Sequence, residues 1–231
     1  ICRHTLTTDK VMTSKVRAIN DSYHGILFQK INAIEGNFLT LSRNDRERLF
    51  KDTELIMDFS TSIAVERKLA DEEHTFRRCT SLLNPKGDDV VLLIEDKDRN
   101  SRLDLLEMDY YRNLIVDERF ALHLEQSGTV RTNTFSCRSE SMILNYENVR
   151  VLSAIISKQI RKYYTLGQAC LSIWHFDAEK GTVSSLPMTI TNWHHEVLGD
   201  IQVYISDAVE KEIQTMTFTS PNKGNWRLFV W

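Results

Sequence analysis

Three charged residues that follow an apolar run carry the chain's most suggestive catalytic pattern. Residues 90–94 read VVLLI, and Glu95, Asp96 and Lys97 come directly after them. Metal-dependent nucleases place an acidic residue, any residue and a lysine in this order at the end of a buried strand. There the carboxylate holds Mg²⁺ together with a second carboxylate, and the lysine steadies the attacking water or the phosphate. The spacing therefore raises a Mg²⁺-dependent nuclease as one function class.

The second carboxylate that such a nuclease needs is badly placed in this chain. If residues 90–94 form a strand that rises about 3.3 Å per residue, Asp89 lies roughly 20 Å from Glu95, too far to share an ion. The acidic residues at 71–73 fall in a charged run with helical character. We therefore interpret residues 95–97 as the solvated, charged tip of a hairpin, and the nuclease stays open as the alternative from the enzyme class.

The histidines and cysteines form no pattern typical of a metal site or a nucleophile. His194 and His195 are adjacent, so they would point to opposite faces of a strand. His175 lies on another predicted strand and has no cysteine or carboxylate at ligand spacing along the chain. We therefore expect no metal, no cofactor and no catalytic residue. The four scattered cysteines are typical of reduced thiols in a cytoplasmic or nuclear protein.

A group of arginines is the candidate for anion recognition. Arg43 and Arg46 lie in a predicted helix, and Arg77 and Arg78 are adjacent further along the chain. Guanidinium groups bind phosphate through paired hydrogen bonds, so these four residues form a candidate phosphate-recognition set. The ordinary alternative, a solvated helix surface, stays open.

Composition argues against several other function classes. Of the 231 residues, 42% are apolar and 26% are charged, as in an ordinary folded domain. The formal net charge of -3 predicts no nucleic-acid partner. No apolar run approaches the roughly 20 residues that cross a bilayer, so we expect no membrane insertion. With only 8 glycines, the chain contains none of the Gly-rich phosphate loops or nucleophile elbows of nucleotide enzymes and α/β hydrolases.

The hydrophobic periodicity predicts an α+β fold. Apolar residues at spacings of three and four predict helices over residues 9–34, 42–69 and 146–164. Residues 90–94 read as a strand that is buried on both faces. Residues 103–110 and 120–137 read as hairpins, with a helix as the alternative for 103–110. Further strands are expected at residues 170–176, 183–186, 188–193, 201–205, 215–219 and 226–231.

Together these elements predict one domain over residues 1–231, in which long helices pack on a largely antiparallel β-sheet. A hairpin, VVLLIEDKDRNSRLDLLEMDY, precedes a buried helix, ENVRVLSAIISKQIRKYYTL, which runs directly into the strand segment QACLSIWHFDAEKG. This order resembles the HORMA-domain family. The last segment, VYISDAVEKEIQTMTFTSPNKGNWRLFVW, is most similar to the closing strands of the HORMA subunit of the autophagy-initiation kinase complex. One departure is that Glu35-Gly36 stands where the family typically has a proline-containing turn.

The resemblance implies a non-enzymatic adaptor or scaffold that binds a protein partner. That partner would be a second HORMA-type subunit in an autophagy-initiation complex, or a closure peptide as in the meiotic and checkpoint members. In several members a C-terminal segment clasps a peptide that is added to the sheet edge. Residues 182–231 would be that clasp here. The implied partner-binding residues are Cys170, Ile173, Trp174, Phe176 and Trp193.

Overall fold

The computed structural model describes most of the chain after residue 35. The described residues are 36–60, 62–71, 75–125, 131–132, 140–141, 145–199, 201–207, 214–220 and 224–230. The helix predicted over residues 9–34 lies outside them. The chain divides into two compact units, residues 1–51 and 52–231, and each is described by itself. The prediction of a single domain over 1–231 stays a prediction.

The first unit contains one described α-helix. The 3₁₀ turn η2 (Phe38–Thr40) precedes α2 (Arg43–Phe50). Ser42 is the N-cap of α2, as its side chain accepts a hydrogen bond from the backbone N–H of Asp45 at 3.1 Å. The helix ends at Phe50, so the helix predicted over residues 42–69 is wrong in extent.

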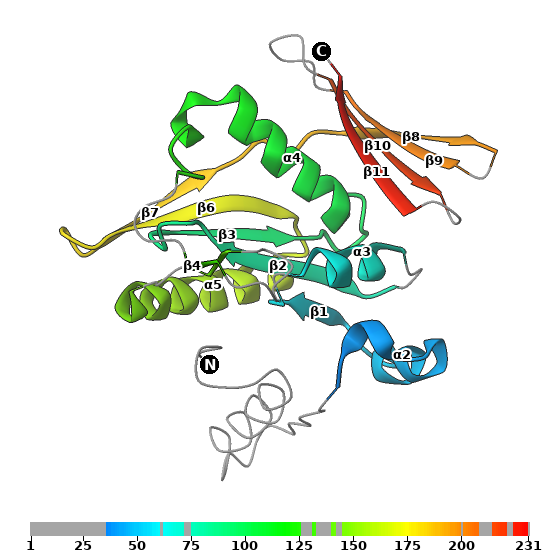
Figure 1. The fold of residues 1–231 in the computed structure, drawn as a ribbon, viewed down its shortest axis with the longest axis horizontal. Helices are drawn as coiled ribbons and strands as arrows, with labels where there is room; N and C mark the ends of the chain where they lie inside the picture. Colours follow the sequence, from blue (N-terminus) through cyan, green and yellow to red (C-terminus); the bar gives the residue numbers. More distant parts are fainter. Residues whose placement is uncertain are drawn as a thin grey trace. The chain divides into compact units, whose positions relative to one another are not determined.

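A five-stranded sheet forms the centre of the second unit, with the order β1-β2-β3-β6-β7 (Figure 1). Its strands are β1 (Leu55–Asp58), β2 (Arg77–Leu83), β3 (Asp89–Ile94), β6 (Cys170–Asp177) and β7 (Thr182–Pro187). Only the β1–β2 pair is parallel, so the sheet is largely antiparallel. All six residues of β3 are buried, which confirms the strand that was predicted to be covered on both faces.

Two helices cover the two faces of this sheet, with α4 (Leu103–Val116) on one side and α5 (Tyr146–Leu166) on the other (Figure 1). Asn145 caps the start of α5, and Gly167 ends it with a φ of 70°, a left-handed conformation that suits glycine. The helix predicted over residues 146–164 is therefore confirmed. The short helix α3 (Ile63–Asp71) follows β1.

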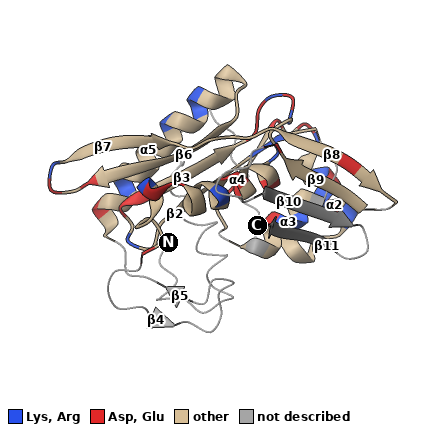
Figure 2. Cartoon of the chain, turned by 90° about the horizontal axis from the view of Figure 1, so that it is seen from above, with Lys and Arg blue, Asp and Glu red and all other residues tan. Residues whose placement is uncertain are grey.

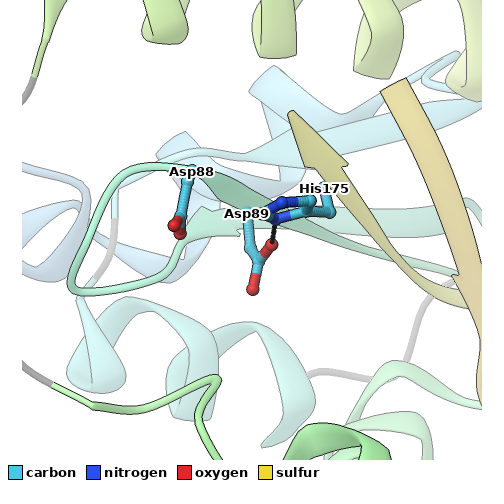
Figure 3. Close-up of side chains that lie close together, drawn as sticks. All are labelled: Asp88, Asp89 and His175. Carbon is cyan, nitrogen blue, oxygen red and sulfur yellow. Dashed lines mark hydrogen bonds and ion pairs between the residues drawn. The ribbon is translucent and has the colours of Figure 1, made fainter. Parts of the chain in front are cut away.

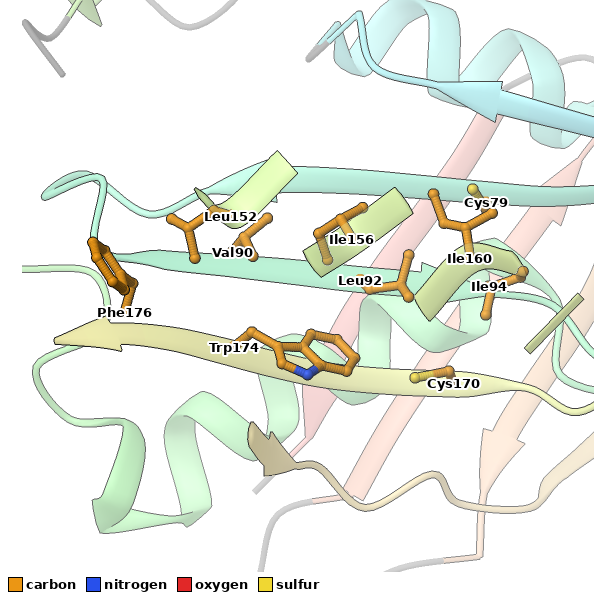
Figure 4. Close-up of a cluster of buried hydrophobic side chains, with 10 residues drawn as sticks. All are labelled: Cys79, Val90, Leu92, Ile94, Leu152, Ile156, Ile160, Cys170, Trp174 and Phe176. Carbon is orange, nitrogen blue, oxygen red and sulfur yellow. The ribbon is translucent and has the colours of Figure 1, made fainter. Parts of the chain in front are cut away.

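The alternation of β3 divides the core into two layers. Val90, Leu92 and Ile94 pack against α5, together with Trp174 of β6 (Figure 4). Val91 and Leu93 pack on the other face against Leu103, Leu106 and Tyr110 of α4. This division follows from the two-residue period of a strand, and it explains why an unbroken apolar run is needed at residues 90–94.

The C-terminal strands form a second, antiparallel sheet with the order β11-β10-β9-β8. They are β8 (Trp193–Leu198), β9 (Ile201–Ser206), β10 (Gln214–Ser220) and β11 (Gly224–Val230). A third, two-stranded sheet pairs β4 (Arg131–Thr132) with β5 (Glu140–Ser141). The mixed α and β content and the largely antiparallel central sheet agree with the predicted fold class. Lys and Arg are interspersed with Asp and Glu along the described elements (Figure 2).

Four local predictions were wrong. Residues 55–58 are strand β1 within the predicted helical stretch, and residues 103–110 belong to helix α4, the alternative to the favoured hairpin. The 3₁₀ turn η3 (Glu118–Phe120) and a following turn stand where the strand of a second hairpin was expected. Residues 188–192 are an irregular linker, so the strand predicted at 188–193 begins only at Trp193.

Candidate functional site

An aspartate and two histidines meet at the end of β3, beside the end of β6. Asp89 is the first residue of β3, and its Cα partner across the antiparallel pair is His175 of β6. Both residues lie on the α4 face of the sheet, because they alternate with Val90 and Trp174, which pack against α5. The turn after η3 brings His123 to the same place.

Asp89 holds both imidazoles by short hydrogen bonds. Its Oδ1 lies 2.7 Å from Nδ1 of His175, and its Oδ2 lies 2.7 Å from Nδ1 of His123. The far nitrogen of His123, Nε2, lies 3.1 Å from the hydroxyl of Tyr110 on α4. An ionised carboxylate only accepts, so both histidines donate to Asp89 from Nδ1.

Burial and hydrogen bonding act in opposite directions on Asp89. Burial by itself raises the pKa of the carboxyl group, because it disfavours the charged form. The hydrogen bonds and the electrostatic attraction of His123 and His175 favour the charged form and together outweigh burial, so the pKa of Asp89 lies below its ordinary value of 3.8. The group is therefore an anion at neutral pH.

A buried asparagine shapes the turn that presents Asp88 and Asp89. Oδ1 of Asn84 accepts the backbone N–H groups of Gly87, Asp88 and Asp89 at 2.9, 3.1 and 3.0 Å. Its Nδ2 donates to Oδ1 of Asp88 at 2.7 Å. Gly87 has a φ of 74°, which a residue with a side chain adopts with strain. The hydrogen bonds of Asn84 thus fix the conformation of the β2–β3 turn.

Asp88 completes a group of three potential metal ligands. One ligand atom each from Asp88, Asp89 and His175 lies within 4.8 Å of the other two. Figure 3 shows the three side chains, with the Asp89 carboxylate between Asp88 and the His175 ring. The backbone N–H of Phe176 donates to the carbonyl oxygen of Asp88 at 2.8 Å, which ties the turn to β6.

This cluster opens on a cavity of about 250 Å³. The apolar part of its lining includes residues of three elements: Phe120 of η3, Ile173 of β6 and Leu186 of β7. Lys86 and Arg119 add positive charge to the lining. A cavity with apolar walls and a few convergent polar groups is the usual form of a ligand site.

The residues expected to bind a protein partner are mostly in the core. Cys170, Trp174 and Phe176 pack against α5, and Ile173 packs in the α4 layer. Both edges of β6 are hydrogen-bonded, one to β3 and the other to β7. Trp193 is half-buried at the start of β8, where its indole N–H donates to Asp109 at 3.4 Å. In this conformation the four β6 side chains are covered, and their partner-binding role stays a prediction.

The four arginines of the candidate phosphate-recognition set form hydrogen bonds or ion pairs with acceptors in the protein itself. Arg77 donates to the carbonyl oxygens of Glu95 at 2.9 Å and of Tyr164, at the end of α5, at 2.9 Å. Arg78 is buried and pairs with Glu95 at 2.8 Å. In the first unit, Arg46 donates to the Leu41 carbonyl, and exposed Arg43 pairs with Glu47. Arg77 and Arg78 are therefore part of the internal structure of the second unit.

Glu95 of the acid-x-lysine pattern is a buried structural residue. It accepts the backbone N–H of Leu103 at 2.8 Å and pairs with Arg99 at 3.1 Å, in addition to its pair with Arg78. The interpretation of Glu95 as a solvated hairpin tip is therefore wrong, although Lys97 is exposed as expected. Asp89 and Glu95 lie at opposite ends of β3, so they do not share an ion.

The histidine–aspartate cluster itself was missed from the sequence. Along the chain, His175 has no carboxylate at ligand spacing, and His123 is a single histidine without a neighbouring ligand-type residue that forms a pattern. Asp89 reaches His175 only through the pairing of β3 with β6, between which the chain forms the two helices α4 and α5 and long connections. The available signal was that Asp89 and His175 each lie at the end of an apolar strand.

No protein-family model matches this chain, and no curated protein is significantly similar to it. The HORMA resemblance therefore stays a prediction. Among the helices of the described residues, none combines the length and apolar character needed to span a membrane.

Proposed function

We propose that this chain binds a divalent transition-metal ion through Asp88, Asp89 and His175. The observation that carries this proposal is that three ligand-type atoms lie within 4.8 Å of one another at the edge of a cavity. Ligand atoms around a tetrahedral ion at about 2.0 to 2.2 Å are about 3.4 Å apart. Small side-chain movements would therefore bring the three atoms to coordination distance.

The ligand types favour a transition metal over Mg²⁺ or Ca²⁺. Two carboxylates and an imidazole suit Zn²⁺, Mn²⁺ or Co²⁺, whereas Mg²⁺ and Ca²⁺ prefer oxygen ligands alone. The 2.7 Å bond between Asp89 and His175 is held by a proton that an ion could replace. Because a metal displaces protons from its ligands, affinity should fall as the pH is lowered.

The residues around the cluster support this use. His123 holds the second oxygen of Asp89, and Tyr110 in turn holds His123. Asn84 holds Asp88 and the backbone of the turn. Such outer hydrogen bonds orient ligands before the ion arrives and raise its affinity. Three protein ligands also leave one position for a water or a small ligand on the cavity side, as in catalytic rather than closed structural sites.

The proposal is tested by titrating the tag-free chain with Zn²⁺, Co²⁺ and Mg²⁺ by calorimetry. We expect one Zn²⁺ per chain, binding at least tenfold weaker in His175→Ala and in Asp88→Asn, and no comparable Mg²⁺ binding. Both side chains are partly exposed, so these variants should fold. The matched control is His194→Ala, which removes an exposed histidine of β8.

Bound Co²⁺ distinguishes this site from the cysteines by its absorption spectrum. We expect bands of a nitrogen and oxygen site without thiolate charge transfer. Equal Zn²⁺ affinity in the wild type and in both cluster variants would show that the cluster is only a structural feature of the hairpin.

Binding of a protein partner is the second candidate function, and the position of β7 favours it. β7 is an outer strand of the central sheet, and five of its six residues are exposed. An outer strand can accept an extended peptide by β-augmentation, the mode that the HORMA resemblance implies. The partner strand would then add to β7 rather than to β6, whose two edges are already paired.

A peptide-display selection on the immobilised chain tests this second function. We expect selected extended peptides to protect the amides of β7 from hydrogen exchange and to lose affinity for Ser184→Pro or Ser185→Pro. Peptides that bind both proline variants as well as the wild type would contradict it.

A further inference from the structure

We infer that the ion-loaded site binds a small carboxylate with an apolar tail, an inference that rests on the proposed metal function. The carboxylate would take the open position on the ion, and the tail would lie along the cavity. Neither the resemblance nor the comparisons assign a ligand to this place. Three properties of the cavity favour this ligand: its charge, its walls and its size.

The charge of the cavity depends on the ion. The lining contains two carboxylates, Asp88 and Asp89, and two cations, Lys86 and Arg119, beside the imidazoles of His123 and His175. Lys86 and Arg119 pair with Glu125 and Asp117, so without an ion the negative charges of Asp88 and Asp89 stand next to the position that an anion would occupy. A divalent ion adds two positive charges at that position. Anion binding should therefore require the metal, and by linkage the anion should raise the affinity for the metal.

The walls favour an apolar body over a second charged group. Phe120, Ile173 and Leu186 face the space next to the cluster, and they offer no hydrogen bonds to oxygen atoms. The two cations of the lining already have carboxylate partners, since Arg119 pairs with Asp117 at 2.6 Å and Lys86 pairs with Glu125. A phosphate group needs several donors at once. A carboxylate can be held by the ion with few further hydrogen-bond donors, so the site suits a carboxylate better than a phosphate.

The size limits the ligand further. A volume of about 250 Å³ is below the roughly 300 to 1,000 Å³ of pockets that hold drug-sized ligands. The cavity therefore fits a short aliphatic chain or one ring rather than a nucleotide or a folded partner. Leu122 of the lining is 67% exposed, so this part of the lining is in contact with solvent.

The experiment compares acetate, butyrate, hexanoate and inorganic phosphate as ligands of the full chain, with and without saturating Zn²⁺. Saturation-transfer NMR reports binding of each carboxylate, and calorimetry reports the Zn²⁺ affinity in its presence. We expect hexanoate to bind only with Zn²⁺, and affinity to rise about threefold to fourfold for each added methylene group that is buried. Phosphate should bind more weakly than hexanoate.

A cavity variant separates the tail site from the metal site. Leu186→Trp fills part of the cavity from β7 without touching the three ligands, so we expect unchanged Zn²⁺ affinity and at least tenfold weaker hexanoate binding. The tail-length series in the wild type provides the same information if this variant does not fold.

The outcomes distinguish this inference from the metal proposal. If the chain binds Zn²⁺ but the loaded chain binds acetate as tightly as hexanoate, the carboxylate inference is overturned and the metal function stands. The same holds if the loaded chain binds phosphate more tightly than hexanoate. Hexanoate binding that is independent of Zn²⁺ also overturns it. Absence of Zn²⁺ binding at the cluster overturns the metal function itself.

Discussion

Asp89 has two histidine donors on one carboxylate, and its ionisation therefore contributes to folding. Its pKa is lowered in the folded chain, because the hydrogen bonds and the electrostatic attraction of His123 and His175 together outweigh the effect of burial. A lowered folded pKa means that the stabilisation is fully present above the unfolded pKa and is lost as the pH falls through the folded pKa.

Replacement of Asp89 by Asn should lower the free energy of unfolding at pH 7 by about 1 to 3 kcal/mol, because buried His123 and partly exposed His175 lose their charged acceptor. The gap between wild type and variant should shrink from about pH 5 downward as the carboxylate of the wild type takes up a proton. Urea unfolding at several pH values measures it. The control is Asp98→Asn, at an exposed position. A gap that widens in acid would contradict the assignment.

The thiols of Cys79 and Cys170 should be unreactive in the folded chain. Burial raises the pKa of Cys79 to about 12 and raises the pKa of Cys170, and the thiolate is the reactive form. Alkylation with iodoacetamide at pH 8, followed by peptide mass spectrometry, should leave both cysteines unmodified until urea is added. Rapid labelling of either cysteine under native conditions would show that β2 or β6 opens.

At the scale of elements, Glu95 joins β3 to β2 and to the start of α4. It bonds to Arg78 of β2 and to the backbone N–H of Leu103 of α4. Glu95→Ala should lower the free energy of unfolding by about 3 to 5 kcal/mol, because it leaves the Arg78 charge buried without this partner. Lys97→Ala, at an exposed position, should change it by no more than about 0.5 kcal/mol. Denaturant titrations of both variants provide the comparison, and similar losses would contradict the structural role of Glu95.

The elements that could be predicted are those whose burial pattern has one period. β3 is a continuous apolar run that is buried on both faces, and α5 has an apolar stripe with a period of 3.6 residues. Both elements were therefore predicted with nearly correct ends. Residues 103–110 fit both periods, and they form α4, a helix that is buried on more than one side, since the consecutive residues Leu105, Leu106, Glu107 and Met108 are all buried. Its buried polar residues weakened the helical stripe on which the prediction depended.

At the scale of the whole molecule, the linker of residues 188–192 connects the two larger sheets and is bonded to α4. Asn113 accepts the backbone N–H of Thr189 at 2.9 Å and donates to its carbonyl oxygen at 2.8 Å. Asp109 accepts the backbone N–H and the hydroxyl of Thr191 at 3.1 and 2.7 Å. Burial raises the pKa of Asp109, and the hydrogen bonds from Thr191 and Trp193 only partly offset this.

Asn113→Ala should loosen this linker without unfolding the central sheet. Hydrogen exchange followed by mass spectrometry should show faster exchange of peptides that cover residues 188–192, with unchanged protection of β3. Leu114→Ala, at the next position of α4, is the control for general weakening of the helix. Uniformly faster exchange across β3 would show that Asn113 supports the whole unit instead.

The candidate site depends on the whole fold, which is why the sequence did not predict it. Asp89 and His175 come together through strand pairing, and His123 arrives from a turn that was expected to be a strand. No local spacing records these contacts. The ends of the two apolar strands could be identified from the sequence, but the antiparallel register of these strands could not.

That register has a further consequence for the uniqueness of the fold. If β6 slipped by one residue against β3, His175 would move to the α5 face, and Asp89 would face Trp174 or Phe176 instead. The apolar residues on both faces of β6 would tolerate such a slip better than an alternating strand would. The Asp89–His175 bond therefore favours the native register. In the mispaired sheet the buried charge of Asp89 would lack one of its hydrogen-bond donors, which raises the free energy of that sheet.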